Sequence, residues 1–433
     1  MREQTMKIYI APQVKQLQKK LGSLVAVSVL AGCTTVGSGF IQPKVDVPKK
    51  WSFNNNEEAS KASGKAWWLN FNDSTLTALI SQAEQENLSL RQSALRIIEA
   101  RAILGLTNAN NLPNINLNGN ASTTSQSEHS SPSPLDNNEM YSLGFDSSWE
   151  IDVWGRLLRQ RESANASHLS LMADYGDMLI SVTAEVASNY IGIRTLQQRI
   201  SLLKNNIELQ ERSLEIAQVW YKNGGRTELD LQQARALVFE TRSQLPSLEQ
   251  QLYQMETALA VLLGTHRMAI LAKLNGSLSI PQFNDKNAVN ISVDLLRRRP
   301  DIRSAEYLAK LQNAELGVKE ADYYPTFSLS GSLGYSLTTG IPPLAGGSSG
   351  SSTSDLLSSD ALQYTAGLGF SWNIFNFERV ANNVRAADAR LQQAIEAYKY
   401  TVISAVKEAE DALVSLDKST QIESHLSQSA QAY

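Results

Sequence analysis

The sequence predicts an internally duplicated fold: long, coiled-coil-like helices combined with four β-strands of the transmembrane-barrel type. Three observations predict it. Apolar residues recur at alternating spacings of three and four over long stretches, which is typical of coiled-coil helices. Four other stretches alternate strictly between apolar and polar residues, which is typical of strands with one apolar face. Finally, segment 105–122 resembles segment 317–334, so the chain contains two copies of one structural unit.

The repeat has a consistent register. Gly105, Pro113 and Gly119 each match a residue of the same type 212 positions later. Beyond the strands the offset becomes 223, as for Trp149 and Trp372. The second copy therefore carries 11 additional residues in the loop between these two blocks.

Length and composition narrow the class of protein. The 433 residues are 42% hydrophobic and 19% charged, a balance that favours neither a disordered chain nor a helical membrane protein. No run of eighteen apolar residues follows Cys33, so no membrane-spanning helix is expected. The net charge of −4 gives no electrostatic reason to expect nucleic acid as a partner.

The first 32 residues have the features of a signal peptide. A basic region precedes the short apolar run Leu21–Leu30. Small residues before Cys33 suit cleavage between Gly32 and Cys33, and the motif resembles the bacterial lipobox, whose thiol receives a diacylglycerol. We expect this covalent lipid on Cys33 and no other cofactor, with Thr34 directing the protein to the outer membrane. A buried structural cysteine is the alternative. The residues after Cys33 are expected to form a flexible tether.

The alternating stretches predict two strand pairs. The first copy alternates over residues 115–121 and 141–149, and the second over 327–337 and 364–374. Alternation alone is compatible with half of a soluble sandwich. Strands of about 10 residues with aromatic ends and polar loops favour a transmembrane barrel. Four strands cannot close such a barrel, because every edge must be paired in lipid. We therefore expect three subunits to build a twelve-stranded barrel.

The apolar seams predict rod-like helices. One seam runs from Met172 to Ile207, and another from Leu231 to Leu262. A helix from Arg156 to Lys222 would be about 100 Å long at 1.5 Å per residue. Between the seams, the stretch YKNGGRTELD breaks the pattern and predicts the tip of a helical hairpin, with Thr227 as the N-cap. Pro246 predicts a kink in the returning helix.

These patterns divide the chain into nine expected segments. They are a signal peptide at 1–32; a lipid-anchored tether at 33–70; a helical segment of the first repeat at 71–111; a transmembrane strand pair at 112–150; a long helical hairpin at 151–265; a linker or equatorial segment at 266–293; a helical segment of the second repeat at 294–323; a second transmembrane strand pair at 324–376; and a helix of the second repeat at 377–433.

Four motifs in combination resemble one family. They are WWLNFNDSTLTALI from Trp67, SWEIDVWGR from Ser148, LPSLEQQLYQMETALAVLLG from Leu245 and LLRRRPDIRSAE from Leu295. The chain is similar to the outer-membrane efflux lipoproteins of the TolC superfamily, in the branch that includes NodT- and OprM-like proteins. The resemblance implies a homotrimer with a twelve-stranded barrel in the outer membrane of a Gram-negative bacterium. A periplasmic barrel of twelve helices, ringed by an equatorial domain, would lie below it.

The same resemblance implies a passive exit duct. Such a channel joins a periplasmic adaptor and an inner-membrane pump of the RND type, and it conducts drugs, metals or other solutes without catalytic residues. At the hairpin tip, the residues implied to meet the adaptor and to narrow the aperture are Gly224, Gly225, Thr227 and Asp230.

Three tryptophans lie at predicted strand ends: Trp149, Trp154 and Trp372. Indole rings favour the membrane–water interface, so we expect these three rings there. The alternative is packing at the junction between strand and helix. Asp301 follows Pro300 within an arginine-rich stretch, which predicts the start of a helix rather than a role in transport.

The sequence departs from the family at its end. The second repeat should have its own tip and returning helix, but the sequence ends at Tyr433 before reaching them. The resemblance places the main gate residues on that second tip, so this sequence is interpreted as a fragment or as the product of a truncated gene. Asp230 is the remaining candidate for an acid facing the pore.

Two other classes compete with the channel. A structural envelope lipoprotein without transport would explain Cys33 and the heptads, but not four amphipathic strands and their duplication. An enzyme is disfavoured because the four histidines have no metal-ligand spacing and no HExxH, GxSxG or phosphate-loop motif occurs. We therefore expect no catalytic and no metal-binding residues. The sequence does not distinguish antibiotics from metal ions as the substrate, because it has no Met or His cluster that would mark a path for metal ions.

Overall fold

The computed structural model describes residues 35–48, 66–124, 138–274, 279–283, 298–339 and 353–432. In chain order the elements are the 3₁₀ helix η1 (Trp67–Phe71), α2 (Ser74–Glu86), α3 (Leu88–Ala109), β1 (Asn114–Thr124), β2 (Asn138–Ile151), α4 (Arg156–Lys222), α5 (Glu228–Leu262), α6 (Arg267–Leu274), α7 (Pro300–Ala321), β3 (Thr326–Thr339), η4 (Thr353–Leu357), η5 (Ser359–Ala361), β4 (Leu362–Ser371) and α8 (Arg379–Ala432).

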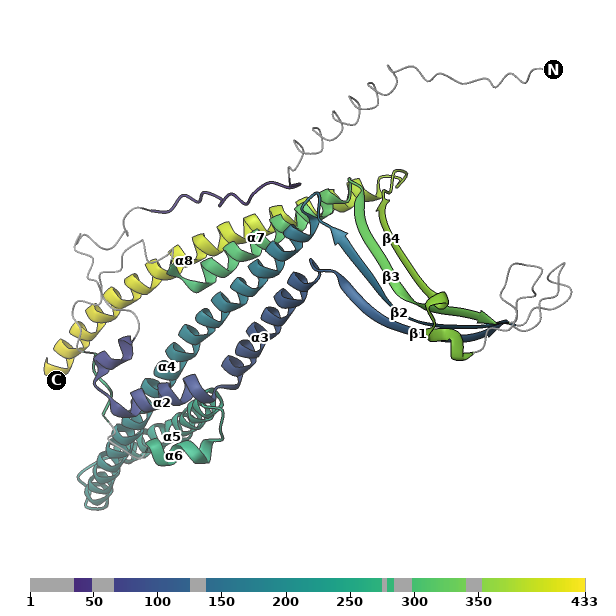
Figure 1. Cartoon of the computed structure of the whole chain (residues 1–433). Helices are drawn as coiled ribbons and strands as arrows, with labels where there is room; N and C mark the ends of the chain where they lie inside the picture. Colours follow the sequence, from purple (N-terminus) through teal and green to yellow (C-terminus); the bar gives the residue numbers. More distant parts are fainter. Residues whose placement is uncertain are drawn as a thin grey trace, which may run out of the picture. The chain divides into compact units, whose positions relative to one another are not determined.

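The two copies of the repeat are visible in these elements (Figure 1). Helices α3 and α7 each have 22 residues and begin 212 positions apart. Strands β1 and β3 begin at the same offset, and helices α4 and α8 begin 223 positions apart. The duplication predicted from sequence is therefore confirmed at the level of whole elements.

The chain divides into two compact units. The first contains residues 1–42, 101–167 and 308–395, and the second contains 43–100, 168–307 and 396–433. The first unit holds the sheet and the helix ends that adjoin it. The second holds η1, α2, α5, α6 and the remaining lengths of the long helices.

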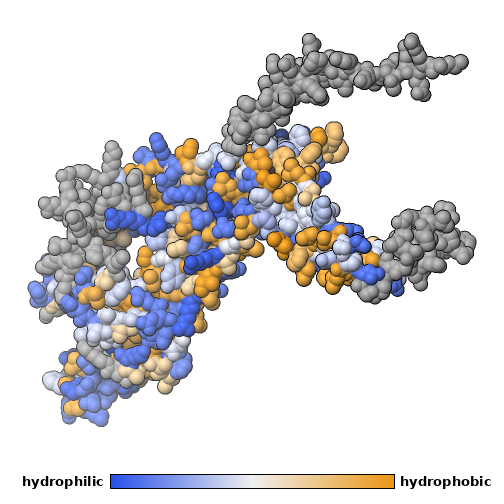
Figure 2. Space-filling view, in the orientation of Figure 1, coloured by the Kyte–Doolittle hydropathy of each residue, from blue (hydrophilic) through white to orange (hydrophobic). Residues whose placement is uncertain are grey.

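In the first unit, four antiparallel strands form one sheet in the order β1-β2-β3-β4 (Figure 1). The register aligns Leu117 with Phe145, Phe145 with Leu333, and Leu333 with Tyr364. One face of the sheet is consequently apolar, and orange residues gather over the strands in Figure 2. The opposite face carries asparagine, serine and threonine, because successive side chains of a strand point to opposite faces.

The second unit contains the main hydrophobic core. The predicted seam of α4 contributes Val186 and Ile193, which are fully buried, whereas Met172 at its start is half exposed. Leu79 of α2, Leu259 of α5 and other buried residues complete this core. The core brings helices α2, α4, α5 and α6 together.

Polar contacts fix this core as well. The hydroxyl of Tyr190 donates to Asp73, the N-cap of α2, over 2.8 Å. The buried guanidinium of Arg194 donates to the carbonyl of Leu274 over 2.8 Å. Helix α5 continues through Pro246 in one run, so the proline does not end the helix.

Of the helices in the described ranges, none has by itself the length and apolarity needed to cross a bilayer; α5 and α6, which meet at a bend of 104°, pass that test only as a pair.

Candidate functional site

At the tip between α4 and α5, two backbone hydrogen bonds cap the C-terminal end of α4. The N–H of Gly224 donates to Tyr221 O over 3.0 Å, and the N–H of Gly225 donates to Trp220 O over 2.8 Å. This pair of bonds is the Schellman motif, which requires a left-handed residue after the helix. Gly224 supplies it with a φ of 76°, a conformation that other residues adopt only with strain.

A capping box begins α5 on the other side of the tip. The hydroxyl of Thr227 accepts from Asp230 N, and the carboxylate of Asp230 accepts from the N–H and the hydroxyl of Thr227. The prediction that Thr227 is the N-cap is therefore confirmed. The Thr227 N–H holds the pKa of Asp230 below its usual range, so this exposed carboxylate is ionised and committed to the cap.

Two of the predicted tryptophans make equivalent hydrogen bonds. Trp149 Nε1 donates to Asn111 O over 2.9 Å, and Trp372 Nε1 donates to Tyr323 O over 3.0 Å. The two acceptors are themselves 212 positions apart, so the repeat extends to single atoms. Each bond ties the end of a strand to the turn that precedes the neighbouring strand.

The third tryptophan joins the two copies. Trp154 Nε1 donates to Pro325 O over 2.9 Å, and its ring stacks on Tyr324 with 4.8 Å between the centroids. All three indole N–H groups thus donate to backbone carbonyls at junctions of strand and helix, as expected if the tryptophans pack at these junctions. The placement of these rings at a membrane interface stays a prediction.

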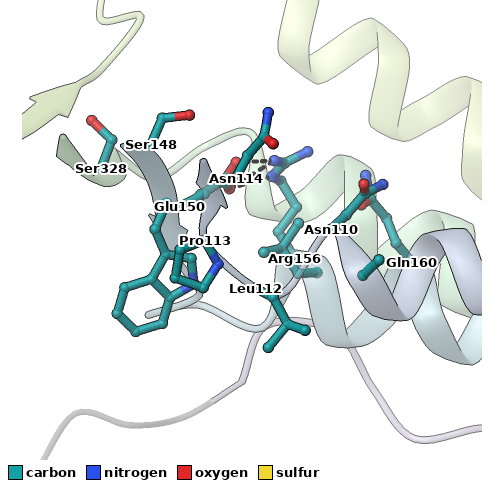
Figure 3. Close-up of a pocket in the computed structure, with 12 residues that line it drawn as sticks. Asn110, Leu112, Pro113, Asn114, Ser148, Glu150, Arg156, Gln160 and Ser328 are labelled. Carbon is teal, nitrogen blue, oxygen red and sulfur yellow. Dashed lines mark hydrogen bonds and ion pairs between the residues drawn. The ribbon is translucent and has the colours of Figure 1, made fainter. Parts of the chain in front are cut away.

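A cavity of about 760 Å³ lies beside the junction of the first copy (Figure 3). Leu112, Pro113 and Trp149 contribute its apolar wall. Glu150 and Arg156 contribute an ion pair with 2.5 Å between nitrogen and oxygen, drawn as dashed lines in Figure 3. The neighbouring acid, Asp152, accepts from Leu158 N over 2.8 Å and so caps α4. Both acids therefore have structural partners.

The segment after the lipobox is docked, so the expectation of a flexible tether is wrong for residues 35–40. Val36 N donates to Trp154 O over 2.9 Å. The nearly buried guanidinium of Arg159 donates to Val36 O over 3.0 Å and to Gly37 O over 2.6 Å, and Asn313 donates to Ser38 O over 2.9 Å. Sequence reasoning missed this clamp because hydrogen bonds to backbone carbonyls leave no pattern in the residues that provide the acceptors. Gly32 and Cys33 lie outside the described residues.

The start of α7 is held by charge. Arg299 pairs with Asp301 over 2.8 Å and with Glu408 of α8 over 2.7 Å, and Asp301 accepts from Ile302 N. The prediction that this stretch begins a helix is confirmed.

Burial, together with the nearby charge of Asp301, raises the pKa of Asp177 on α4. Throughout the part of the chain that the structure describes, no three His, Cys, Asp or Glu side chains lie close enough to hold a metal ion.

The comparisons with known proteins agree with this architecture. The family model described as "Outer membrane efflux protein" matches residues 79–265 and 291–433. Nodulation protein T of Rhizobium leguminosarum bv. viciae is 28% identical over 405 residues, covering 93% of this chain and 80% of the relative. The probable outer membrane lipoprotein SilC of Salmonella typhimurium is 28% identical over 418 residues, covering 94% of this chain and 85% of the relative.

Among solved structures, the outer-membrane channel OprN matches with a TM-score of 0.79 and 28% identity, covering 92% of this chain and 86% of that chain. The matched ranges of the family model make up most of the sequence. The chain therefore belongs to the outer membrane efflux protein family, whose members are the outer-membrane exit channels of efflux systems.

Proposed function

We propose that this chain forms the exit duct of a tripartite efflux system as a homotrimer, with three four-stranded sheets closing into one twelve-stranded barrel. One observation carries the proposal: the sheet exposes its apolar face, with Leu117 62% exposed, Phe145 54% exposed and Leu368 70% exposed. Half of a soluble sandwich would cover such a face with a second layer. Within the described residues no such layer covers it, and lipid is the environment that suits it.

The ends of the sheet support the same proposal. Within the described residues, β1 and β4 each pair with one neighbour only, so both edges offer unpaired backbone groups. Unpaired groups are costly in lipid, and pairing β4 of one copy with β1 of the next satisfies them. The polar face would then line the channel, since it carries Asn116, Asp146 and Ser332 in adjacent strands.

We further propose that Cys33 is acylated after cleavage behind Gly32. The lipobox-like motif supports this, as does the similarity to a relative named as a lipoprotein. The strap formed by residues 35–40 is clamped to the first unit by Arg159 and Asn313, so an acyl chain on Cys33 would begin two residues from a docked segment. The lipid and the barrel are two attachments to the same outer membrane.

The helical tip is proposed as the contact with a periplasmic adaptor protein. Its rigid Schellman motif and capping box present Gly224, Gly225, Thr227 and Asp230 in one defined turn. An inner-membrane pump of the RND type would supply the energy, and the chain itself would perform no chemical step. Charge and shape at the tip would then govern which adaptor fits.

The test uses the full chain in a strain that lacks its own exit duct. We expect a trimer in outer-membrane fractions that resists SDS until heated, and ion conductance when the trimer is added to a planar bilayer. Co-expression with the cognate pump and adaptor should restore tolerance to their substrate. A chain that stays monomeric outside the membrane would contradict the proposal. A membrane trimer without conductance would instead support the structural lipoprotein.

A further inference from the structure

The turn between β4 and α8, residues 372–378, exposes large apolar side chains. Phe375 is 88% exposed, Phe377 is 95% exposed and Ile374 is 63% exposed. Two consecutive residues of this turn have left-handed backbones, with φ of 47° at Phe377 and 60° at Glu378. Such conformations cost free energy in residues other than glycine, and they persist where the surroundings require them. The turn therefore holds its apolar side chains in solvent, in a strained backbone that no contact among the described residues accounts for.

The equivalent turn of the first copy is docked. Trp154 and Gly155 stand 223 positions before Phe377 and Glu378, and Gly155 has the same left-handed backbone with a φ of 82°. Trp154 rests on the α7–β3 turn of the second copy, through its stack on Tyr324 and its hydrogen bond to Pro325 O. A ring at this position of the repeat thus has a defined receptor.

The backbones of the two turns match from Gly155 and Glu378 onward, although only Phe377, and not its equivalent Trp154, has a positive φ. Arg159 N donates to Gly155 O over 2.9 Å, and the equivalent Asn382 N donates to Glu378 O over 2.8 Å. The tryptophan bonds to Asn111 O and Tyr323 O match in the same way. The repeat can therefore be used to locate the receptor of Phe377.

That receptor lies on the α3–β1 turn. The residues that precede Tyr324 and Pro325 by 212 positions are Leu112 and Pro113. Leu112 is 66% exposed, and both residues line the cavity of Figure 3. In the second copy, Trp154 of the first copy covers the equivalent place. In the first copy, nothing from the described residues of the same chain covers Leu112 to that extent.

The adjoining helices show the same difference. In the last three turns of α7, three apolar residues are buried: Ala314, Val318 and Ala321. Their equivalents in α3 are exposed: Ala102, Leu106 and Ala109. The surface around Leu112 thus has the apolar character of an interface, and the described part of one chain leaves it exposed.

We propose that the β4–α8 turn of one protomer docks in the cavity beside Leu112 and Pro113 of the next copy, with the ring of Phe377 on Leu112. This contact between protomers is the equivalent of the stacking of Trp154 on Tyr324 within one protomer. It joins two different surfaces, so it is a head-to-tail contact that can close into a ring. The inference rests on the proposed homotrimer and names the residues that make it.

Engineered cysteines test this contact in the full-length chain, where Cys33 is the single natural cysteine. The double variant Phe377→Cys/Leu112→Cys should form dimers and trimers linked by disulfides under mild oxidation, and reductant should remove them. Each single variant should give no such ladder. As a calibration, Trp154→Cys/Tyr324→Cys should lose its free thiols without any increase in mass, because that pair lies within one chain. Phe377→Cys/Tyr324→Cys should give no bond between chains.

The outcomes separate this inference from the proposed function. A trimer that forms without the Phe377–Leu112 cross-link overturns the inference and leaves the exit duct intact. A chain that never forms a trimer overturns both.

A second variant avoids reliance on cross-linking. Phe377→Trp restores the indole N–H that Trp154 uses, so it should donate to Pro113 O of the neighbour and raise the temperature at which the trimer dissociates. Phe377→Asp should lower that temperature. Phe375→Asp is the control and should change it less, because Phe375 is 88% exposed and its equivalent in the first copy is not the docked Trp154. An unchanged dissociation temperature in both Phe377 variants would overturn the proposal.

Discussion

The two copies of the repeat have the same elements but hold their junctions differently. In the first copy the turn after the strands carries Trp154 and Gly155, and it is docked and covered by the strap at residues 35–40. In the second copy the same turn carries Phe377 and Glu378, and it is exposed. The first copy therefore closes a contact within the chain, whereas the equivalent turn of the second copy is the one proposed to contact another copy.

The largest difference is expected at Arg159 and its equivalent, Asn382. Arg159→Ala removes two hydrogen bonds from a charged, buried donor to the strap, a loss of about 3 kcal/mol. Asn382→Ala should change stability little, because Asn382 is exposed. Limited proteolysis between residues 35 and 48, together with the unfolding temperature, measures both effects. Continued protection of the strap in Arg159→Ala would show that Asn313 and the backbone bonds suffice.

The left-handed turn residues provide a reciprocal pair. Gly155→Ala places a Cβ at a φ of 82° and 3.1 Å from Thr35, so we expect a loss of about 2 kcal/mol. Glu378→Gly relieves the same backbone conformation, offset in part by the greater freedom of the unfolded chain, for a net gain below about 1 kcal/mol. Thermal unfolding in detergent should move in opposite directions for the two variants. A shift in the same direction would mean that the turns are not equivalent.

The two equivalent tryptophan bonds should differ in strength. Trp149→Phe keeps a half-buried ring but leaves Asn111 O without its donor, which costs about 1 kcal/mol. Trp372→Phe should cost less, since Trp372 is 51% exposed in the single chain and water can replace the lost donor. Equal losses measured on the assembled trimer, but unequal losses on the isolated chain, would indicate that assembly covers Trp372.

The smallest expected change in stability comes from the difference between the starts of α3 and α7. Asn87 and Arg299 are equivalent positions before α3 and α7, but only Arg299 lies in a charged cluster, where the pKa of Asp177 is raised by burial. A raised pKa means that the charged form of Asp177 destabilises the folded chain at neutral pH. Asp177→Asn should therefore raise the unfolding temperature slightly at pH 7, and the gain should vanish as the pH falls toward the unfolded pKa of 3.8. A gain that grows at low pH would contradict this sign.

Local patterns predicted the parts of the fold that depend on local residues. Alternation located all four strands, the heptad seam located the buried side of α4, and Gly224 with Thr227 located the tip. The repeat offsets predicted which elements are equivalent. These features follow from the periodicity of side chains along a helix or strand and from turn chemistry, which neighbouring residues suffice to determine.

Only the tertiary structure decided what touches what. The docking of residues 35–40 depends on Arg159 and Asn313, which are far along the chain and donate to backbone carbonyls that every residue type has. The use of the tryptophans at junctions likewise depends on acceptors from distant turns. The sequence by itself determined two equivalent turns, Trp154–Gly155 and Phe377–Glu378. The fold decided that the first turn is docked and the second exposed, because among the described residues the α7–β3 turn receives Trp154 and no segment covers Phe377 in the same way.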